Sequence, residues 1–198
     1  MDIKAFIFDM DGLLFDSERI VQRSWEIAGD ELGIPHMGDV IYHTLGMNRA
    51  GRNEYFRKYI REDFPFEEFG KLTRDNFWKI VDKEGLPLKK GAKELLAYGK
   101  SQGYKMAVAT SSSREYAMGN LIRAGIDSYF DSVVCGDMVK KAKPDPEIYQ
   151  KACESLGIQP EYCMAFEDAP GGILSAHQAG MHVIMVPDLV QPTQEIRE

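Results

Sequence analysis

Long apolar runs are missing from this chain of 198 residues. Its most apolar segments, such as the one inside residues 4–9, are far shorter than the roughly 20 residues that a membrane-spanning helix needs. The N-terminal Met1-Asp2-Ile3-Lys4 has no basic segment followed by a long apolar stretch, which argues against a secretory signal. The sequence therefore predicts a cytoplasmic protein with no membrane partner.

Cysteine is scarce, and basic residues are outnumbered by acidic ones. Cys135, Cys153 and Cys163 are an odd set without Cys-x-x-Cys spacing, which argues against a disulfide framework and a zinc site. The 24 Lys and Arg residues against 31 Asp and Glu residues leave a net charge of −7 without a basic cluster. This balance argues against nucleic acid as the main partner, and an anionic ligand would need a local cationic site. We expect a monomer that binds a small molecule.

Short apolar segments alternate with helical patterns along most of the chain. The strand candidates lie at Lys4–Asp9, Tyr104–Thr110, Ser132–Cys135, Tyr162–Glu167 and His182–Val186. The helical patterns between them lie at Ala92–Ser101, Arg114–Ala124, Pro146–Leu156 and Gly172–Ala179. This alternation predicts an α/β fold with a doubly wound parallel sheet, in which catalytic groups gather at the carboxyl ends of the strands.

Residues 16–85 interrupt this alternation, because they contain no convincing strand. They show successive amphipathic helices at Ser17–Leu32, Gly38–Leu45, Asn48–Glu62 and Phe66–Glu84. We therefore predict an inserted all-helical domain over residues 16–85, and an α/β core built from residues 1–15 and 86–198. The aromatic residues expected to fill the helical core are Trp25, Phe56, Tyr59, Phe69, Phe77 and Trp78.

Chemistry-bearing residues follow the predicted strands. Asp9-Met10-Asp11-Gly12 comes directly after the first strand, and Gly12 permits a turn that lets both carboxylates face one centre. Three further motifs follow in order, and they are Thr110-Ser111, Lys143-Pro144 and Glu167-Asp168. In this order and at these strand ends, the four motifs resemble those of the haloacid dehalogenase superfamily, whose phosphotransferases begin with Asp-x-Asp-Gly.

The resemblance implies a role for each residue. Asp9 would be the nucleophile that forms an aspartyl-phosphate, and Asp11 the acid and base that serves the leaving oxygen and then the acceptor. Lys143 would bridge the phosphate and the nucleophile. Thr110 and Ser111 would cradle the phosphate, and Ser112 and Ser113 are expected to cap the next helix.

A metal ion is expected at the same site. A phosphate dianion beside Asp9, Glu167 and Asp168 would gather about five negative charges, which repel one another strongly in a poorly hydrated site. Mg²⁺ suits such a set of oxygen ligands. The resemblance implies that Asp9, the carbonyl of Asp11 and Asp168 hold it, with Glu167 either binding the ion or lying just behind its ligands.

The helical insertion resembles the cap of the branch that contains β-phosphoglucomutase and sugar-phosphate phosphatases. The segment Leu45-Gly46-Met47-Asn48-Arg49 is similar to the substrate loop of that branch, in which an arginine binds phosphate. Arg49 is therefore either a phosphate ligand or a surface arginine at a helix start. Arg74 and Lys71 are weaker candidates. Val21 stands where the mutases have a histidine that couples cap closure to proton transfer.

We therefore predict a Mg²⁺-dependent phosphomonoester hydrolase that acts on a small sugar phosphate or similar metabolite through an aspartyl-phosphate. The alternative is a β-phosphoglucomutase-like mutase, which the missing histidine disfavours. A dehalogenase is disfavoured because C–halogen cleavage needs neither an acid at the position of Asp11 nor Mg²⁺. A catalytically silent binding protein would be expected to have lost at least one of Asp9, Asp11, Lys143 and Asp168, and all four are present.

Overall fold

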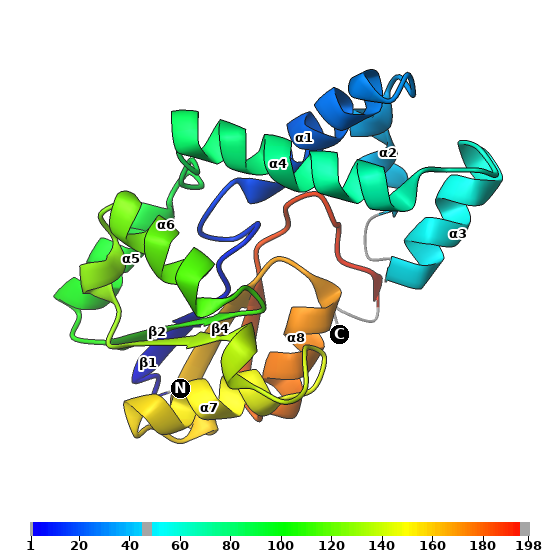
Figure 1. Cartoon of the computed structure of the whole chain (residues 1–198). Coiled ribbons are helices and arrows are strands. Elements are labelled where there is room, and N and C mark those ends of the chain that lie inside the picture. The colour runs from blue at the N-terminus through cyan, green and yellow to red at the C-terminus, as the bar shows by residue number, and fades with distance from the viewer. Residues whose placement is uncertain (1, 45–48, 195–198) are drawn as a thin grey trace. The chain divides into compact units, whose positions relative to one another are not determined.

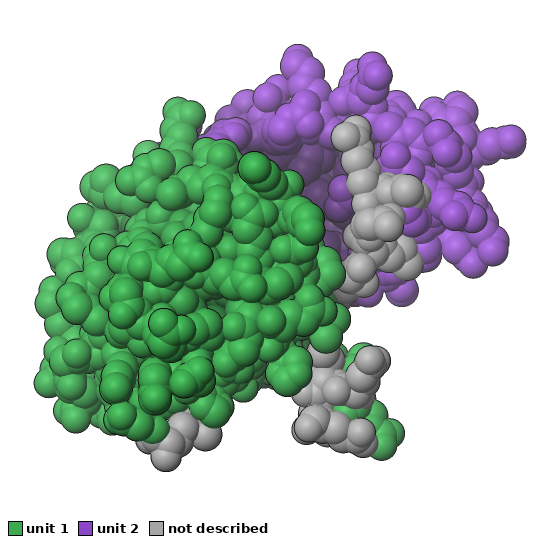
Figure 2. Space-filling model, turned by 90° about the horizontal axis from the view of Figure 1, so that it is seen from below, with its two compact units in different colours: residues 1–16, 86–198 green, residues 17–85 purple. Residues whose placement is uncertain are grey.

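The computed structural model describes residues 2–44 and 49–194, with the side chains of Arg49 and Ala50 outside that description. The chain forms two compact units (Figure 2). The core unit comprises residues 1–16 and 86–198, and the helical unit comprises residues 17–85. Among the described residues, no helix combines the length and the apolar character that crossing a membrane requires.

The core unit contains a five-stranded parallel sheet in the order β3-β2-β1-β4-β5. The strands are β1 (Ala5–Phe8), β2 (Lys105–Thr110), β3 (Ser132–Cys135), β4 (Cys163–Glu167) and β5 (His182–Met185). The helices are α5 (Ala92–Ser101), α6 (Arg114–Arg123), α7 (Glu147–Leu156) and α8 (Pro170–Gln178), and 3-10 turns lie at Asp127–Tyr129, Gly136–Met138 and Pro160–Tyr162. Helices α5 and α6 cover one face of the sheet, and α7 and α8 cover the other (Figure 1). The predicted doubly wound parallel sheet is confirmed.

Successive side chains of β1 point to opposite faces of the sheet, and each face has its own buried core. Ile7 of β1 packs with Ala109 of β2 and Tyr149 of α7, all within one buried cluster. Phe8 points to the opposite face, where its ring stacks on that of Phe166 with the centroids 5.0 Å apart. Residues two apart in a strand share a face. Asp9, which follows Phe8, therefore points to the same face as Ile7, toward α7.

Helix α8 begins at Pro170, two residues earlier than the predicted start at Gly172. Proline suits the first position of a helix, because its missing N–H would have no partner there. The start of this helix therefore lies only two residues after Asp168.

The helical unit consists of α1 (Ser17–Glu31), α2 (Met37–Thr44), α3 (Arg49–Tyr59) and α4 (Phe66–Glu84). Trp25, Phe56 and Phe69 are buried, as the sequence predicts, and their rings meet edge to face. The same expectation is wrong for Tyr59 and Trp78, which are 60% and 44% exposed. Trp78 lies two residues from both Asn76 and Ile80, which are buried, so it sits roughly 200° around the helix from each of them.

Candidate active site

Asp9 lies at the carboxyl edge of the sheet, directly after β1. The residue is only 8% exposed, and its backbone N–H donates to the carbonyl of Phe166 at 3.0 Å. Register explains what lies beside it. Phe8 pairs with Phe166 in the parallel ladder, so the next residues along the two chains, Asp9 and Glu167, stand side by side.

Lys143 joins these two carboxylates. Its ammonium group donates to Oδ1 of Asp9 and to Oε1 of Glu167, both at 2.6 Å, and to the carbonyl of Ala109 at 3.0 Å. These three acceptors account for its three protons. The loop that carries Lys143 is fixed by Glu147, whose carboxylate accepts hydrogen bonds from the backbone N–H groups of Lys140 and Lys141.

Tyr149 also belongs to the site, although the sequence analysis did not single it out. Its hydroxyl donates to Oε1 of Glu167 at 2.8 Å and lies 3.4 Å from the ammonium nitrogen of Lys143. The other oxygen of Glu167 accepts from the backbone N–H groups of Asp168 and Ala169 at 3.1 and 3.3 Å. The one available signal was a tyrosine on the apolar face of the helical pattern 146–156, because a buried tyrosine hydroxyl usually finds a polar partner.

Burial and neighbouring charges shift the ionisation of these groups. Burial raises the pKa of Asp9 from 3.8 to about 7, with the charge of Lys143 opposing this rise and that of Glu167 adding to it. For Lys143, burial by itself lowers the pKa, but Asp9 and Glu167 outweigh it and hold the pKa above its ordinary value. Lys143 is therefore a permanent cation, whereas Asp9 needs a further cation before its carboxylate is fully ionised at neutral pH.

Three carboxylates offer a site for that cation. One oxygen each from Asp9, Glu167 and Asp168 lie within 4.8 Å of one another. Carboxylate oxygens are the ligands that hard divalent cations prefer, so this donor set fits Mg²⁺. Gly12 leaves the room that Asp168 needs, because a Cβ atom at position 12 would lie 2.3 Å from Oδ2 of Asp168. Its φ of 82° also suits glycine better than other residues.

The carboxylate of Asp11 takes part in different contacts. Oδ2 accepts a hydrogen bond from the hydroxyl of Ser112 at 2.7 Å, and Oδ1 accepts one from the hydroxyl of Tyr116 at 3.1 Å. The expectation that Ser112 caps α6 is therefore wrong. Ser113 alone caps this helix, with its hydroxyl oxygen accepting from the backbone N–H of Tyr116 at 3.4 Å.

Of the three predicted phosphate ligands, the structure describes the side chains of Thr110 and Ser111. Thr110 ends β2 and is 1% exposed, and its hydroxyl oxygen accepts from the backbone N–H of Ser112 at 3.1 Å. This leaves the hydroxyl proton of Thr110 available to a phosphate oxygen. Ser111 follows it and is exposed. Arg49 begins α3, but its side chain and the residues 45–48 of the predicted substrate loop lie outside the described part of the chain.

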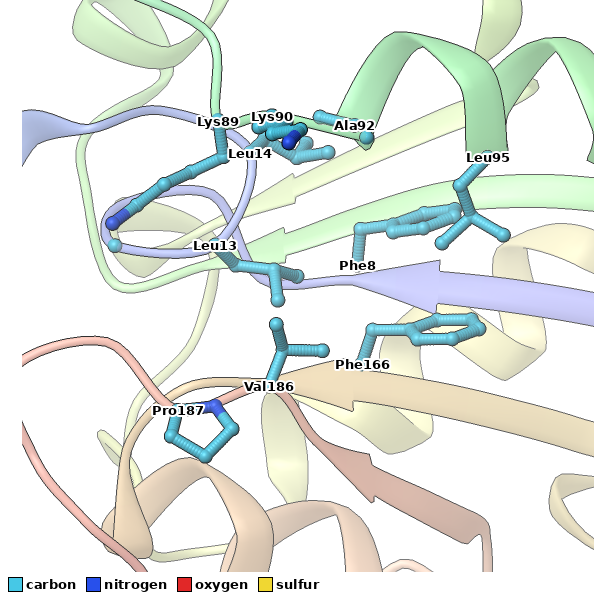
Figure 3. Close-up of a pocket in the computed structure, with 12 residues that line it drawn as sticks. Phe8, Leu13, Leu14, Lys89, Lys90, Ala92, Leu95, Phe166, Val186 and Pro187 are labelled. Carbon is cyan, nitrogen blue, oxygen red and sulfur yellow. The ribbon is translucent and has the colours of Figure 1, made fainter.

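A cavity of about 370 Å³ in the core unit lies beside this site without belonging to it. Its walls are mainly apolar, and the side chains of Leu13 and Val186 point toward each other within it, with Phe8 and Phe166 nearby (Figure 3). Of the residues described above as forming the site, only Gly12 borders it. Lys89 and Lys90 also line this cavity, and the ammonium group of Lys89 is already paired with the carboxylates of Asp188 and Asp16.

The helical unit contains a second cavity of about 350 Å³, and its lining is more polar. Arg74, which the sequence singled out, lines this cavity together with Arg52 and Asn53, which it did not. Thr73 also lines it, and its hydroxyl oxygen is buried without a hydrogen-bond partner. Lys71, the other residue proposed on this helix, is exposed and not part of the lining.

Comparison with known proteins agrees with this geometry. A family described as haloacid dehalogenase-like hydrolase matches residues 6–186. The phosphorylated carbohydrates phosphatase of Thermotoga maritima is 34% identical over 182 residues, which cover 92% of this chain and 84% of that protein. Hexitol phosphatase A of Escherichia coli is 32% identical over 186 residues, covering 94% and 84%. The crystal structure of CbbY from Rhodobacter sphaeroides, in complex with phosphate, superposes with a TM-score of 0.72 at 26% identity, covering 97% and 90%.

The fold, the site and these matches define a hydrolase of the phosphatase class. The chain belongs to the haloacid dehalogenase-like hydrolase family, and it lies close to the branch of β-phosphoglucomutases and sugar-phosphate phosphatases. The resemblance drawn from the four motifs is thereby confirmed. Members of this family typically use a metal ion, and the carboxylates of Asp9, Glu167 and Asp168 are present to hold one.

Proposed function

We propose that this protein is a Mg²⁺-dependent phosphatase that hydrolyses a small sugar phosphate or similar metabolite through an aspartyl-phosphate. One observation carries the proposal: the ammonium group of Lys143 bonds the carboxylates of Asp9 and Glu167 at the same time, both at 2.6 Å. A carboxylate nucleophile is thus held beside a fixed cation. Relatives named for phosphorylated carbohydrates and for hexitol support the class of substrate.

The reaction takes place in two displacements at phosphorus. An oxygen of Asp9 attacks the phosphorus atom and the bond to the leaving oxygen breaks, while Asp11 gives that oxygen its proton. Asp11 then removes a proton from water, the water oxygen attacks the phosphorus, and Asp9 leaves as a carboxylate with release of inorganic phosphate. Lys143 neutralises charge throughout, and Thr110 and Ser111 bind phosphate oxygens.

In this proposal, Mg²⁺ is held by Asp9, the carbonyl of Asp11 and Asp168. Glu167 either binds the ion as well or lies behind its ligands, where it holds Lys143. When bound, the ion supplies positive charge next to the transferring phosphoryl group. Its charge also favours the ionised form of Asp9, whose pKa burial raises to about 7.

The helical unit is proposed to recognise the leaving group. Its own cavity supports this assignment, because Arg52, Arg74 and Asn53 provide hydrogen-bond donors and line it together with Trp25. Donors of this kind suit the hydroxyl groups of a sugar or polyol. The role of Arg49 as a phosphate ligand remains a proposal from the resemblance.

The experiment is a panel of phosphorylated sugars, polyols and other metabolites, assayed for phosphate release with and without Mg²⁺. We expect Mg²⁺-dependent release from a sugar or polyol phosphate, and none from Asp9→Asn. If no member of the panel released phosphate above the Asp9→Asn level, the proposal would be wrong.

A second assay separates the hydrolase from the mutase alternative. With Val21 in place of the cap histidine, β-glucose 1-phosphate supplied with catalytic glucose 1,6-bisphosphate should release phosphate faster than it forms glucose 6-phosphate. Predominant formation of glucose 6-phosphate would instead establish the mutase.

A further inference from the structure

The cavity of the helical unit is lined by two cations and by no acid. Arg52 of α3 and Arg74 of α4 both border it. The rest of its lining consists of apolar side chains, a glycine, Asn53 and Thr73, so no Asp or Glu among the residues that the structure describes takes part. The cavity therefore concentrates positive charge in a chain whose net charge is −7.

Two different contacts keep these guanidinium groups at the cavity. The guanidinium carbon of Arg52 lies 5.6 Å from the ring centroid of Trp25, which also lines the cavity, and this is a cation–π contact. A Cβ atom at Gly70 would lie 3.6 Å from Nη1 of Arg74, so the side chain of Arg74 lies back along α4 beside Gly70. Arg74 is exposed, and within residues 2–44 and 49–194 it forms no hydrogen bond or ion pair.

Thr73 adds a second group that lacks a partner. Its hydroxyl oxygen is buried without a hydrogen bond, although a threonine in a helix can bond the carbonyl one turn earlier. Buried polar groups in native proteins nearly always have a partner, and an exception needs an explanation. Thr73 and Arg74 are neighbours in α4 and both line the cavity, so an acceptor bound there would supply what the described residues do not.

An anionic group suits this lining better than a neutral sugar or polyol. A guanidinium group can donate to a hydroxyl, but it donates two parallel hydrogen bonds to a carboxylate or a phosphate and is neutralised as well. The aromatic walls include Trp25, Phe56 and Phe69, and charges attract each other more strongly where such walls displace water. A neutral ligand would displace water from both arginines without giving them a counter-charge.

We propose that the substrate carries a second anionic group on its leaving portion, either a carboxylate or a phosphate, and that Arg52, Arg74 and Thr73 bind it. This inference rests on the proposed function, because it assumes that the helical unit receives the leaving group. It narrows the substrate from sugar phosphates in general to phosphorylated sugar acids and sugar bisphosphates. The amide of Asn53 is then available to the hydroxyl groups of the sugar.

The test compares substrates that differ in the second anion. The first pair is 6-phosphogluconate and glucitol 6-phosphate, which are both open-chain and differ at C1, where a carboxylate replaces a hydroxymethyl group. The second pair is fructose 1,6-bisphosphate and fructose 6-phosphate. We expect kcat/KM for phosphate release to be about tenfold to hundredfold higher for the anionic member of at least one pair, the effect of a hydrogen bond between charged groups. The pair that shows the preference identifies the anion as carboxylate or phosphate.

Variants of the cavity assign the preference to its arginines. Arg74→Gln and Arg52→Gln should each lower kcat/KM for the anionic member about tenfold, and for the neutral member much less. Arg74→Lys keeps the charge but loses the paired N–H groups, so it should retain part of the preference. Lys71→Gln removes a positive charge from the same helix outside the cavity, and it should leave the preference unchanged.

Binding can be measured apart from the chemistry in Asp9→Asn, which lacks the proposed nucleophile. Calorimetric titration of this variant at saturating Mg²⁺, with the two members of the preferred pair, should give a lower Kd for the anionic one. Higher salt should reduce the difference. Adding Arg74→Gln should bring the two Kd values together, and this substitution is at an exposed side chain, so the fold should tolerate it.

The outcomes separate this inference from the proposed function. Equal kcat/KM within both pairs would overturn the inference, and so would a preference that survives in both Arg74→Gln and Arg52→Gln. Phosphate release from the neutral members would leave the proposed function standing in either case. If neither pair nor p-nitrophenyl phosphate released phosphate above the Asp9→Asn level, the proposed function would fail and the inference with it.

Discussion

The hydroxyl of Tyr149 donates to Oε1 of Glu167 at 2.8 Å in a place where neither side chain is more than 2% exposed. The same oxygen accepts from the ammonium group of Lys143, which in turn bonds Asp9. Tyr149 therefore acts on Asp9 through Glu167 and Lys143. Its hydrogen bond orients the carboxylate of Glu167, which in turn orients the ammonium group of Lys143.

Tyr149→Phe is expected to weaken both the fold and the site. Loss of a buried hydrogen bond to a charged group costs about 1.5–3 kcal/mol of unfolding free energy. We expect kcat to fall about tenfold with little change in KM, because Lys143 is left less well oriented. Urea denaturation and steady-state kinetics would measure these effects. Tyr98→Phe is the control, since Tyr98 is 52% exposed, and equal effects of the two substitutions would contradict the assigned role.

The two aspartates of the first motif should fail in different ways. Asp9→Asn removes the nucleophile, so no phosphoenzyme and no turnover are expected. Asp11→Asn should slow turnover of alkyl phosphates by about 10²–10⁴-fold, the usual contribution of general acid–base catalysis. With p-nitrophenyl phosphate, Asp11→Asn should still give a rapid burst of nitrophenolate equal to one per enzyme, followed by slow release of phosphate. A burst in Asp9→Asn, or none in Asp11→Asn, would reverse the assignment.

Binding of Mg²⁺ should depend on pH through Asp9. Burial raises the pKa of Asp9 to about 7, so below pH 7 the free site holds a proton that the ion has to displace. The apparent affinity should therefore fall by up to about tenfold per pH unit as the pH drops below 7, and level off above it. Calorimetric titration in buffers of different ionisation enthalpy would count the released protons. Asp9→Asn should bind Mg²⁺ more weakly and lose this slope, and an unaltered slope would show that another group titrates.

A single methyl group should disrupt the site at Gly172. A Cβ atom at this position would lie 1.8 Å from Oε1 of Glu167, so Gly172→Ala must displace that carboxylate. We expect a loss of about 1–3 kcal/mol of unfolding free energy, typical of overpacking, together with strongly reduced activity. Gly171→Ala is the matched control, because a Cβ atom there would meet nothing within 4 Å. Comparable losses in both variants, measured by denaturation and phosphate release, would exclude the steric explanation.

The helical cavity should affect specificity without affecting chemistry. Arg74→Gln removes a guanidinium group from its lining, so we expect KM for the preferred sugar phosphate to rise about tenfold while kcat for p-nitrophenyl phosphate stays the same. Lys71→Gln, on the same helix but outside the cavity, should change neither value. If both substitutions raised KM equally, a general effect of surface charge would be the better explanation.

Much of the fold follows from local patterns in the sequence. Short apolar segments alternating with amphipathic ones predict the parallel sheet, and the carboxylates and the lysine that follow the strands mark its catalytic edge. Such patterns are local, because burial on two faces and helical periodicity can each be recognised from a short run of consecutive residues. The family resemblance has the same origin, since it depends on four short motifs read in order.

The contacts between those motifs were decided by the tertiary structure. Asp9 stands beside Glu167 because the ladder pairs Phe8 with Phe166, and no pattern near either residue specifies that register. Ser112 resembles a helix cap in sequence, yet its hydroxyl bonds Asp11, a residue 101 positions away. A hydrogen bond requires the donor and acceptor to lie within a few tenths of an ångström of their preferred separation. Such separations are set only after strands and helices far apart in the chain have packed together.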